Sequence, residues 1–123
     1  MKKKILVIED EVVLQKSMMD FLSEEGFEVF GALDGEAGLQ LAKKEKPDLI
    51  LLDIVLPIKD GFEVLTELKQ SDDLKNIPVI LLTNLDSMEN VQRAFEFGVS
   101  TYLVKANYKL EDISKKVQEA LKM

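Results

Sequence analysis

The chain of 123 residues contains no cysteine and no histidine. Without cysteine it can form neither a disulfide framework nor a thiolate metal site, which agrees with a reducing cytoplasm. Without histidine it can have no Ser-His-Asp triad, no histidine-ligated zinc and no imidazole general base. The absence of histidine is the stronger of the two exclusions.

Long apolar runs and an excess of basic residues are missing as well. The longest apolar runs are far too short to cross a bilayer, and acids follow the basic residues 2–4 too soon for an export signal. The formal net charge of -7 argues against direct nucleic-acid contact, because phosphate neutralisation needs clustered Lys and Arg. We therefore expect a soluble, cytoplasmic protein with one domain over residues 1–123 and no output domain.

Short apolar runs alternate with amphipathic segments along the chain. Strands are expected over 4–8, 27–30, 48–53, 77–83 and 100–104. Helices are expected over 11–25, from 34–36 onward, over 61–70, from a capping-box-like Asp86 and Glu89 through Phe97, and from about Lys109. Five such alternations predict an α/β fold, a doubly wound five-stranded parallel sheet with helices on both faces.

Two of the expected helices each have a predicted inner face. In the helix after 34–36, Ala37, Leu41 and Ala42 lie on one side of a helical wheel. The inner face predicted for the last helix consists of Leu110, Ile113, Val117 and Leu121. We expect these residues to pack against the sheet.

Asp53 ends a run of four apolar residues, 49–52, that is typical of a strand buried on both faces. Ligands of open α/β sheets collect outside the carboxyl ends of the strands, so Asp53 is the candidate for chemistry. The alternative is a turn residue, because Pro57 and Asp60-Gly61 are turn signals nearby.

Residues from four strand ends are expected at one edge of the sheet: Glu9, Asp10, Asp53, Thr83 and Lys105. Three carboxylates with no apolar or basic group between them repel each other unless a cation lies there. Mg²⁺ prefers such ligands, with the Val55 carbonyl as a further contributor. For Glu11 we favour a helix N-terminal acid stabilised by the helix dipole.

A carboxylate beside Mg²⁺ can act as a nucleophile toward phosphorus, and Asp53 is placed to do so. The Thr83 hydroxyl and the Lys105 ammonium could bind the phosphoryl oxygens. Taken singly, Thr83 fits an ordinary β-branched strand residue and Lys105 a solvated lysine. Together, at adjacent strand ends, they are better explained as a phosphate clamp.

The motifs ILVIEDE (5–11), DLILLDIVLP (48–57) with Asp60-Gly61, PVILLT (78–83) and YLVK (102–105) resemble the receiver domain of two-component response regulators, in a single-domain, chemotaxis-regulator-like form. The resemblance covers essentially the whole chain. It implies a flavodoxin-like sheet in the order 2-1-3-4-5. It also implies that Asp53 is the phosphoacceptor and that Glu9, Asp10, Asp53 and the Val55 carbonyl hold Mg²⁺.

The resemblance further implies how the phosphoryl group is received and sensed. The donor is a partner's phosphohistidine, in a sensor histidine kinase or phosphotransfer protein, or a small phosphodonor. Thr83 moves toward the phosphoryl group and Tyr102 turns inward, although Tyr102 alone fits an ordinary residue at a sheet edge. The face formed by the helix after Thr83, the fifth strand and the last helix then binds a downstream protein or a second copy.

The expected protein is a switch with weak self-catalysed phosphotransfer and autodephosphorylation, and not a metabolic enzyme. A receiver-like interaction scaffold that takes no phosphate is the alternative. A haloacid-dehalogenase-type phosphatase would need an Asp-x-Asp pair after the first strand, whereas Val12 lies two places after Asp10. A flavin-binding domain would need a Ser/Thr/Gly-rich phosphate loop there, which the sequence lacks.

The sequence departs from the family pattern at Glu9 and Ala106, and also at Asn84, which follows Thr83 where a small residue is common. Glu9 stands where Asp is more frequent, and its longer side chain could contact the metal through water. Ala106 stands where proline is usual, so we predict a trans peptide or an altered loop after Lys105. Among the aromatic residues near the last strand, we choose Phe97 as the exposed one.

Overall fold

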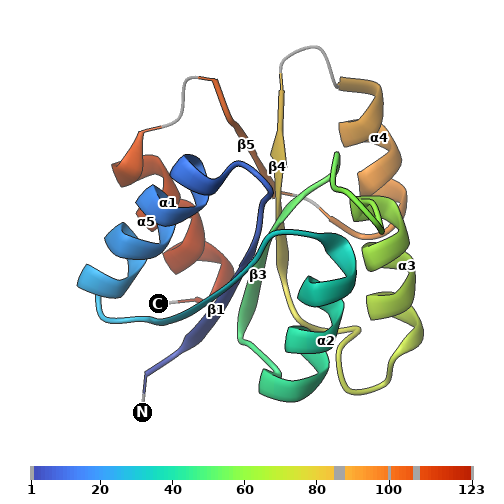
Figure 1. The fold of residues 1–123 in the computed structure, drawn as a ribbon, viewed down its shortest axis with the longest axis horizontal. Helices are drawn as coiled ribbons and strands as arrows, with labels where there is room; N and C mark the ends of the chain where they lie inside the picture. Colours follow the sequence, from blue (N-terminus) through green and yellow to red (C-terminus); the bar gives the residue numbers. More distant parts are fainter. Residues whose placement is uncertain (1, 85–87, 100, 107–108, 123) are drawn as a thin grey trace.

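The computed structural model describes residues 2–84, 88–99, 101–106 and 109–122. The strands in this part of the chain are β1 (Lys4–Ile8), β2 (Glu28–Ala32), β3 (Leu49–Asp53), β4 (Val79–Thr83) and β5 (Thr101–Val104). They form one parallel sheet in the order β2-β1-β3-β4-β5 (Figure 1). The doubly wound α/β fold and the strand order implied by the family resemblance are both confirmed.

The helices cover both faces of this sheet. In the described ranges they are α1 (Val12–Glu24), α2 (Gly35–Glu45), α3 (Gly61–Gln70), α4 (Met88–Glu96) and α5 (Leu110–Ala120). Figure 1 shows α1 and α5 on one face and α2, α3 and α4 on the other. The bounds expected for the strands and helices differ from the observed bounds by no more than two residues. The capping role expected of Asp86 falls outside the described residues.

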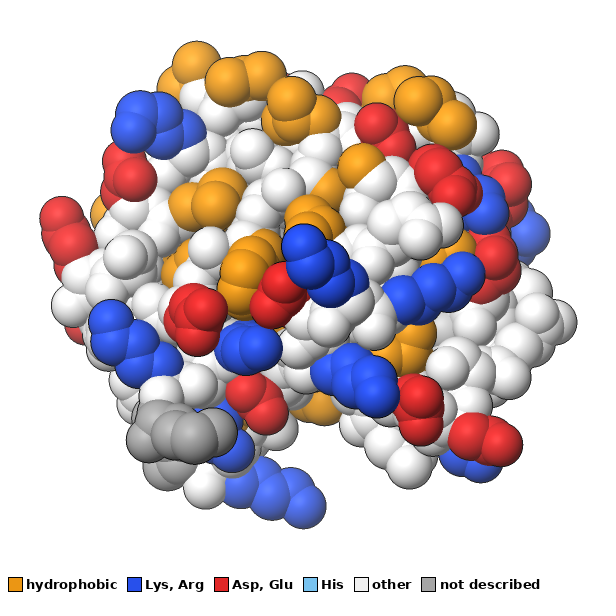
Figure 2. Space-filling model, turned by 60° about the horizontal axis from the view of Figure 1, so that its bottom comes forward, with side chains coloured by type: hydrophobic (Ala, Val, Ile, Leu, Met, Phe, Trp, Pro, Cys, Tyr) orange, Lys and Arg blue, Asp and Glu red, His pale blue; other side chains and the backbone are white. Residues whose placement is uncertain are grey.

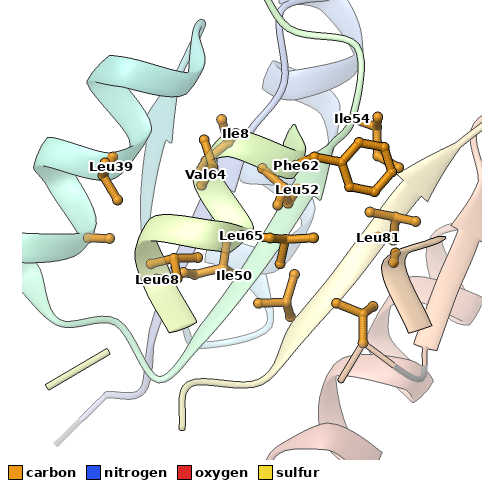
Figure 3. Close-up of a cluster of buried hydrophobic side chains, with 14 of the residues drawn as sticks. Ile8, Leu39, Ile50, Leu52, Ile54, Phe62, Val64, Leu65, Leu68 and Leu81 are labelled. Carbon is orange, nitrogen blue, oxygen red and sulfur yellow. The ribbon is translucent and has the colours of Figure 1, made fainter. Parts of the chain in front are cut away.

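The central strands are buried along their whole lengths because both of their faces are covered. β3 and β4 have no exposed residue, and both are near-continuous runs of Ile, Leu and Val before their polar ends. One core cluster packs α2, α3 and α4 onto the sheet, with Phe62 and Leu65 of α3 lying over Leu52 (Figure 3). The other cluster packs α1 and α5 onto the opposite face.

Helix starts and ends follow the local sequence. The Asp34 side chain caps α2 by accepting a hydrogen bond from the Ala37 N–H at 2.7 Å, and Asp60 caps α3 by accepting one from the Glu63 N–H at 2.9 Å. Gly26 follows α1 with φ +100°, a conformation that L side chains disfavour. The two capped helix starts follow strand ends and position loops at the carboxyl edge of the sheet, whereas Gly26 lies at the opposite edge, before β2.

The predicted inner face of α2 is confirmed at Ala42 and in part at Leu41, which packs against the larger core cluster, and is wrong at Ala37. Ala37 is exposed and Leu41 only half-buried, whereas Gly38, Leu39 and Ala42 are buried. A Cβ on Gly38 would lie 2.5 Å from the Ile8 side chain, so the missing side chain lets this helix approach β1 closely. Because glycine has no apolar side chain, the apolar periodicity of the sequence does not mark Gly38 as part of the inner face.

The two ends of the predicted α5 face also differ from expectation. Ile113 and Val117 are buried, but Leu110 is 38% exposed and Leu121 is only half-buried. Leu110 is the first residue of the helix and lies outside the core, whereas Leu121 follows the last residue of the helix and still packs against the core cluster.

The choice of Phe97 as the exposed aromatic is wrong. Phe97 is half-buried, packs against the larger core cluster, and its ring centroid lies 6.0 Å from that of Phe62. Phe95 is the exposed residue, with 47% of its surface accessible. The reason is that α4 ends at Glu96, so Phe97 leaves the helix and turns back toward α3.

Lysines and acids are interspersed at the amino edge of the sheet. Lys4 pairs with Glu45 at 3.3 Å and Lys75 with Asp72 at 3.2 Å. On the face seen in Figure 2, lysine or arginine side chains lie among acidic ones, not in a single basic patch. Within the described residues, no helix is both long and apolar enough to span a membrane.

Candidate functional site

Four strands bring the predicted residues to the carboxyl edge of the sheet. Glu9 and Asp10 follow β1, Asp53 ends β3, Thr83 ends β4 and Lys105 follows β5. The Lys105 backbone N–H donates to the Thr83 carbonyl oxygen at 2.7 Å, which continues the β4–β5 pairing to the edge. Because parallel strands point the same way, residues far apart in sequence meet here.

Asp53 is buried, with 4% of its surface accessible. Its Oδ1 accepts a hydrogen bond from the Val55 N–H at 3.2 Å, a local contact of the turn type. Its Oδ2 accepts one from the Lys105 ammonium at 2.9 Å. Asp53 is therefore a turn residue and also a member of a long-range cluster.

The Lys105 ammonium lies in the middle of the acidic groups. Its Nζ is 2.9 Å from Glu9 Oε1, 2.9 Å from Asp53 Oδ2 and 2.5 Å from Glu11 Oε2. The expectation that no basic group lies between the carboxylates is thus wrong, because the chain leaving β5 carries this lysine inward. Burial lowers the Lys105 pKa, but its contacts with the carboxylates of Glu11, Glu9 and Asp53 together outweigh burial and raise the pKa above its usual value.

Glu11 belongs to this cluster, which the sequence interpretation missed. It is the N-cap residue of α1, yet its side chain makes no capping hydrogen bond. The carboxylate contacts Lys105 instead, while 60% of the side chain remains exposed. Its place two residues after Glu9, at the end of a strand, was the available signal.

Glu9 is fully buried. Its Oε2 accepts a hydrogen bond from the Glu11 N–H at 2.9 Å. Burial raises the pKa of Glu9 to about 7, and the charge of Asp53 adds to this effect, although the Glu11 N–H and Lys105 oppose it. Near neutral pH this carboxyl is therefore partly protonated in the metal-free protein.

The acidic residues fit a hard divalent cation. Glu9, Asp10 and Asp53 each offer one carboxylate oxygen, and these oxygens lie within 4.8 Å of one another. Oε1 of Glu9 is buried without a well-directed hydrogen bond among the described residues, although the Lys105 charge is near. Oxygen donors that carry negative charge are the ligands that Mg²⁺ prefers.

The loop between β3 and α3 carries the Val55 carbonyl and is fixed at several points. The Gly61 N–H donates to the Ile54 carbonyl at 2.7 Å. Lys59 forms an ion pair with Glu36 of α2 at 3.0 Å and a second one with Glu67 of α3. The backbone next to Asp53 is therefore attached to both neighbouring helices.

A sequence model of the response regulator receiver domain matches residues 5–118. The chain belongs to the response regulator receiver family. CiaR, a transcriptional regulatory protein of Streptococcus pneumoniae, is 40% identical over 119 residues, which are 97% of this chain and 51% of CiaR. Sporulation initiation phosphotransferase F of Bacillus subtilis is 32% identical over 121 residues, 98% of this chain and 95% of that protein. This receiver chain thus spans about half the length of CiaR.

Solved receiver structures have the same fold. Chemotaxis protein CheY4 of Vibrio cholerae superposes with a TM-score of 0.90 at 28% identity, covering 98% of this chain and 99% of CheY4. The receiver domain of the Pseudomonas aeruginosa sensor histidine kinase PA1611 has a TM-score of 0.89 at 25% identity over the whole of both chains, with a magnesium ion coordinated in its active-site cleft. Receiver domains bind Mg²⁺ at an acidic site and interact with histidine kinases or phosphotransfer proteins.

The remaining predicted residues of this receiver domain lie close to the edge. Thr83 is 3% exposed, and its hydroxyl donates to the Asn84 carbonyl at 3.2 Å. Tyr102 of β5 is half-buried and packs against the larger core cluster. The Lys105–Ala106 peptide is trans, as predicted.

Proposed function

We propose that the Asp53 carboxylate accepts a phosphoryl group and that this receiver domain is a phosphorylation-activated switch. The observation that supports it most directly is the 2.9 Å contact between the Lys105 ammonium and Asp53 Oδ2. A buried carboxylate with a cation beside it supplies both a nucleophile and a counter-charge for phosphoryl oxygens.

The phosphoryl donor is a phosphohistidine on a sensor histidine kinase or phosphotransfer protein, or a small phosphodonor. This chain has no histidine and so supplies no phosphohistidine itself. With a phosphohistidine donor, an Asp53 oxygen attacks phosphorus, the new O–P bond forms as the N–P bond breaks, and the imidazole nitrogen leaves with the bonding electron pair. Later attack of water on phosphorus restores the carboxylate and releases inorganic phosphate. These slow self-catalysed steps are its only chemistry, and it is not a metabolic enzyme.

Glu9, Asp10, Asp53 and the Val55 carbonyl would hold Mg²⁺. When bound, the ion neutralises charge that would otherwise repel the incoming phosphoryl group. The Thr83 hydroxyl and the Lys105 ammonium would donate hydrogen bonds to the phosphoryl oxygens. This assignment gives every charged group of the site a role except Glu11.

The output of the switch is a change at the face formed by α4, β5 and α5. Thr83 moves toward the new dianion and Tyr102 turns inward, which biases a packed element between two arrangements. The exposed Phe95 of α4 lies among the elements of this face. A downstream protein or a second copy then binds one arrangement better, without direct nucleic-acid contact or membrane insertion, in the cytoplasm.

The test is the intact mass of the protein after incubation with acetyl phosphate. We expect the mass of one phosphoryl group to be added with Mg²⁺ and none with EDTA. Asp53→Asn should remain unlabelled, whereas Asp72→Asn, which removes an acid whose side chain is 96% exposed, should be labelled like the wild type. Labelling of Asp53→Asn at the wild-type level would contradict the proposal.

The second candidate is an interaction scaffold that takes no phosphoryl group. It predicts no mass increase under any of these conditions and the same size in solution with and without acetyl phosphate. Sizing of both samples therefore separates the two functions.

A further inference from the structure

The Lys105 ammonium lies against three carboxylates and donates a well-directed hydrogen bond to Asp53. An ammonium group has three N–H donors and no acceptor, and Nζ lies within 2.9 Å of oxygens from Glu9, Glu11 and Asp53. Only 9% of the lysine side chain is exposed, so water has little access to it. A phosphoryl oxygen on Asp53 can gain this ammonium only if one of the present contacts gives way.

Glu11 is the partner that can leave at the smallest cost. Glu9 is fully buried, so its unpaired charge would be costly, and Asp53 is the group that carries the phosphoryl. Glu11 is 60% exposed, and water can solvate its carboxylate once the ion pair opens. The side chain makes no capping bond to α1, so this helix loses no hydrogen bond when the side chain moves.

We propose that Glu11 is an autoinhibitory positioning residue, whose carboxylate occupies the Lys105 ammonium that the phosphoryl group must use. The inference rests on the proposed role of Asp53. Phosphorylation then includes an exchange of anions on Lys105: the Glu11 carboxylate moves into water and a phosphoryl oxygen takes its place. Glu11 therefore slows phosphorylation by an amount typical of a partly exposed ion pair.

The first test compares Glu11→Gln with the wild type in acetyl phosphate and Mg²⁺. In this reaction Asp53 gains the O–P bond and acetate leaves with the electron pair of the broken P–O bond. The initial rate of mass labelling should rise about two- to fivefold, the range expected for a surface ion pair. Glu24→Gln removes the same charge from an exposed site at the other end of α1 and should leave the rate unchanged.

The second readout is the NMR signal of the Lys105 ammonium, because a merely structural change in α1 would not move it. The signal should shift in Glu11→Gln and stay at its wild-type position in Glu24→Gln. An unchanged or slower labelling rate in Glu11→Gln would overturn the inference, as would an unshifted Lys105 signal or an equal acceleration by Glu24→Gln. If the wild type takes no label at all, the proposed function fails, and the NMR comparison still decides whether Glu11 holds Lys105.

Discussion

A Cβ atom on Gly61 would lie 2.6 Å from the carbonyl oxygen of Asp53. The Gly61 N–H also donates to the Ile54 carbonyl at 2.7 Å, so the first turn of α3 packs directly on the backbone that leaves β3. Backbone atoms cannot move aside as a flexible side chain can. The acidic edge of the sheet and the start of α3 therefore pack directly against each other at Gly61, which has no side chain to separate them.

Replacing Gly61 with alanine should disturb both stability and metal binding. We expect the unfolding free energy to fall by about 1–3 kcal/mol, the usual cost of overpacking, and Mg²⁺ affinity to fall because the Val55 carbonyl is displaced. Urea denaturation and calorimetric Mg²⁺ titration measure the two effects. In Gly38→Ala the added Cβ meets the Ile8 side chain, so this control should change stability but not Mg²⁺ affinity. Wild-type values for both quantities in Gly61→Ala would refute the coupling.

Replacing Ile58 with glycine should stabilise the protein. It is β-branched and 80% exposed, and it has φ +69° in a tight turn in which the Lys59 N–H donates to the Pro57 carbonyl at 2.7 Å. Left-handed backbone costs such a residue about 1–2 kcal/mol, more than the roughly 0.5–1 kcal/mol of backbone entropy that glycine loses on folding. Ile58→Gly should therefore raise the unfolding free energy by up to about 1 kcal/mol.

The matched control for Ile58→Gly is Val55→Gly in the same loop. Val55 is also β-branched and exposed but does not have positive φ, so glycine brings only its entropic cost there. Urea denaturation should show Ile58→Gly stabilised and Val55→Gly destabilised. A loss of stability in both variants would show that the backbone at Ile58 is not strained.

The residues at the strand ends could be predicted from sequence because their meeting depends only on parallel strands. Asp53, Thr83 and Lys105 each follow a recognisable apolar run, and topology then brings them to one edge. The position of Glu11 after β1 places it near this edge, but its pairing with Lys105 depends on how two long side chains lie, which leaves no periodic pattern in the sequence.

The errors in the helix faces have a different cause. Gly38 has no side chain, so hydropathy alone does not show that it is the point of closest approach to Ile8. For Phe97, the helical wheel was extended one residue beyond the end of α4. The hydropathy pattern of the sequence predicts where helices and strands lie, but not where two of them come closest or at which residue each one ends.

The stability of the metal-free protein should depend on pH through Glu9. Its pKa is raised from 4.5 to about 7 in the folded state, so its favourable contribution is complete below about pH 4.5 and is lost as pH rises through about 7. No histidine titrates in this range. In EDTA, the unfolding free energy should therefore fall between about pH 4.5 and 7, and Glu9→Gln should lack this decrease.

Mg²⁺ should reverse this dependence because it binds the carboxylate and expels the proton. Mg²⁺ affinity should rise through about pH 7 in the wild type. Equal pH slopes of stability in the wild type and Glu9→Gln would contradict the assignment.

Two phenylalanines near the end of α4 should behave differently when truncated. Phe97→Ala removes the contact with the Phe62 ring and should lower the unfolding free energy by about 1–3 kcal/mol. Phe95→Ala, at a 47% exposed position, should cost less than about 1 kcal/mol. Thermal unfolding measures both, and a larger loss for Phe95→Ala would contradict the packing described for α4.

The chemical identity of the phosphorylated residue tests the central claim most directly. The protein is labelled with acetyl phosphate and Mg²⁺, and borohydride then reduces the acyl phosphate to an alcohol as phosphate leaves. Peptide mass mapping should find homoserine at position 53 alone. Homoserine, or its counterpart from glutamate, at Asp10, Glu9 or another acid with position 53 unmodified would contradict the account.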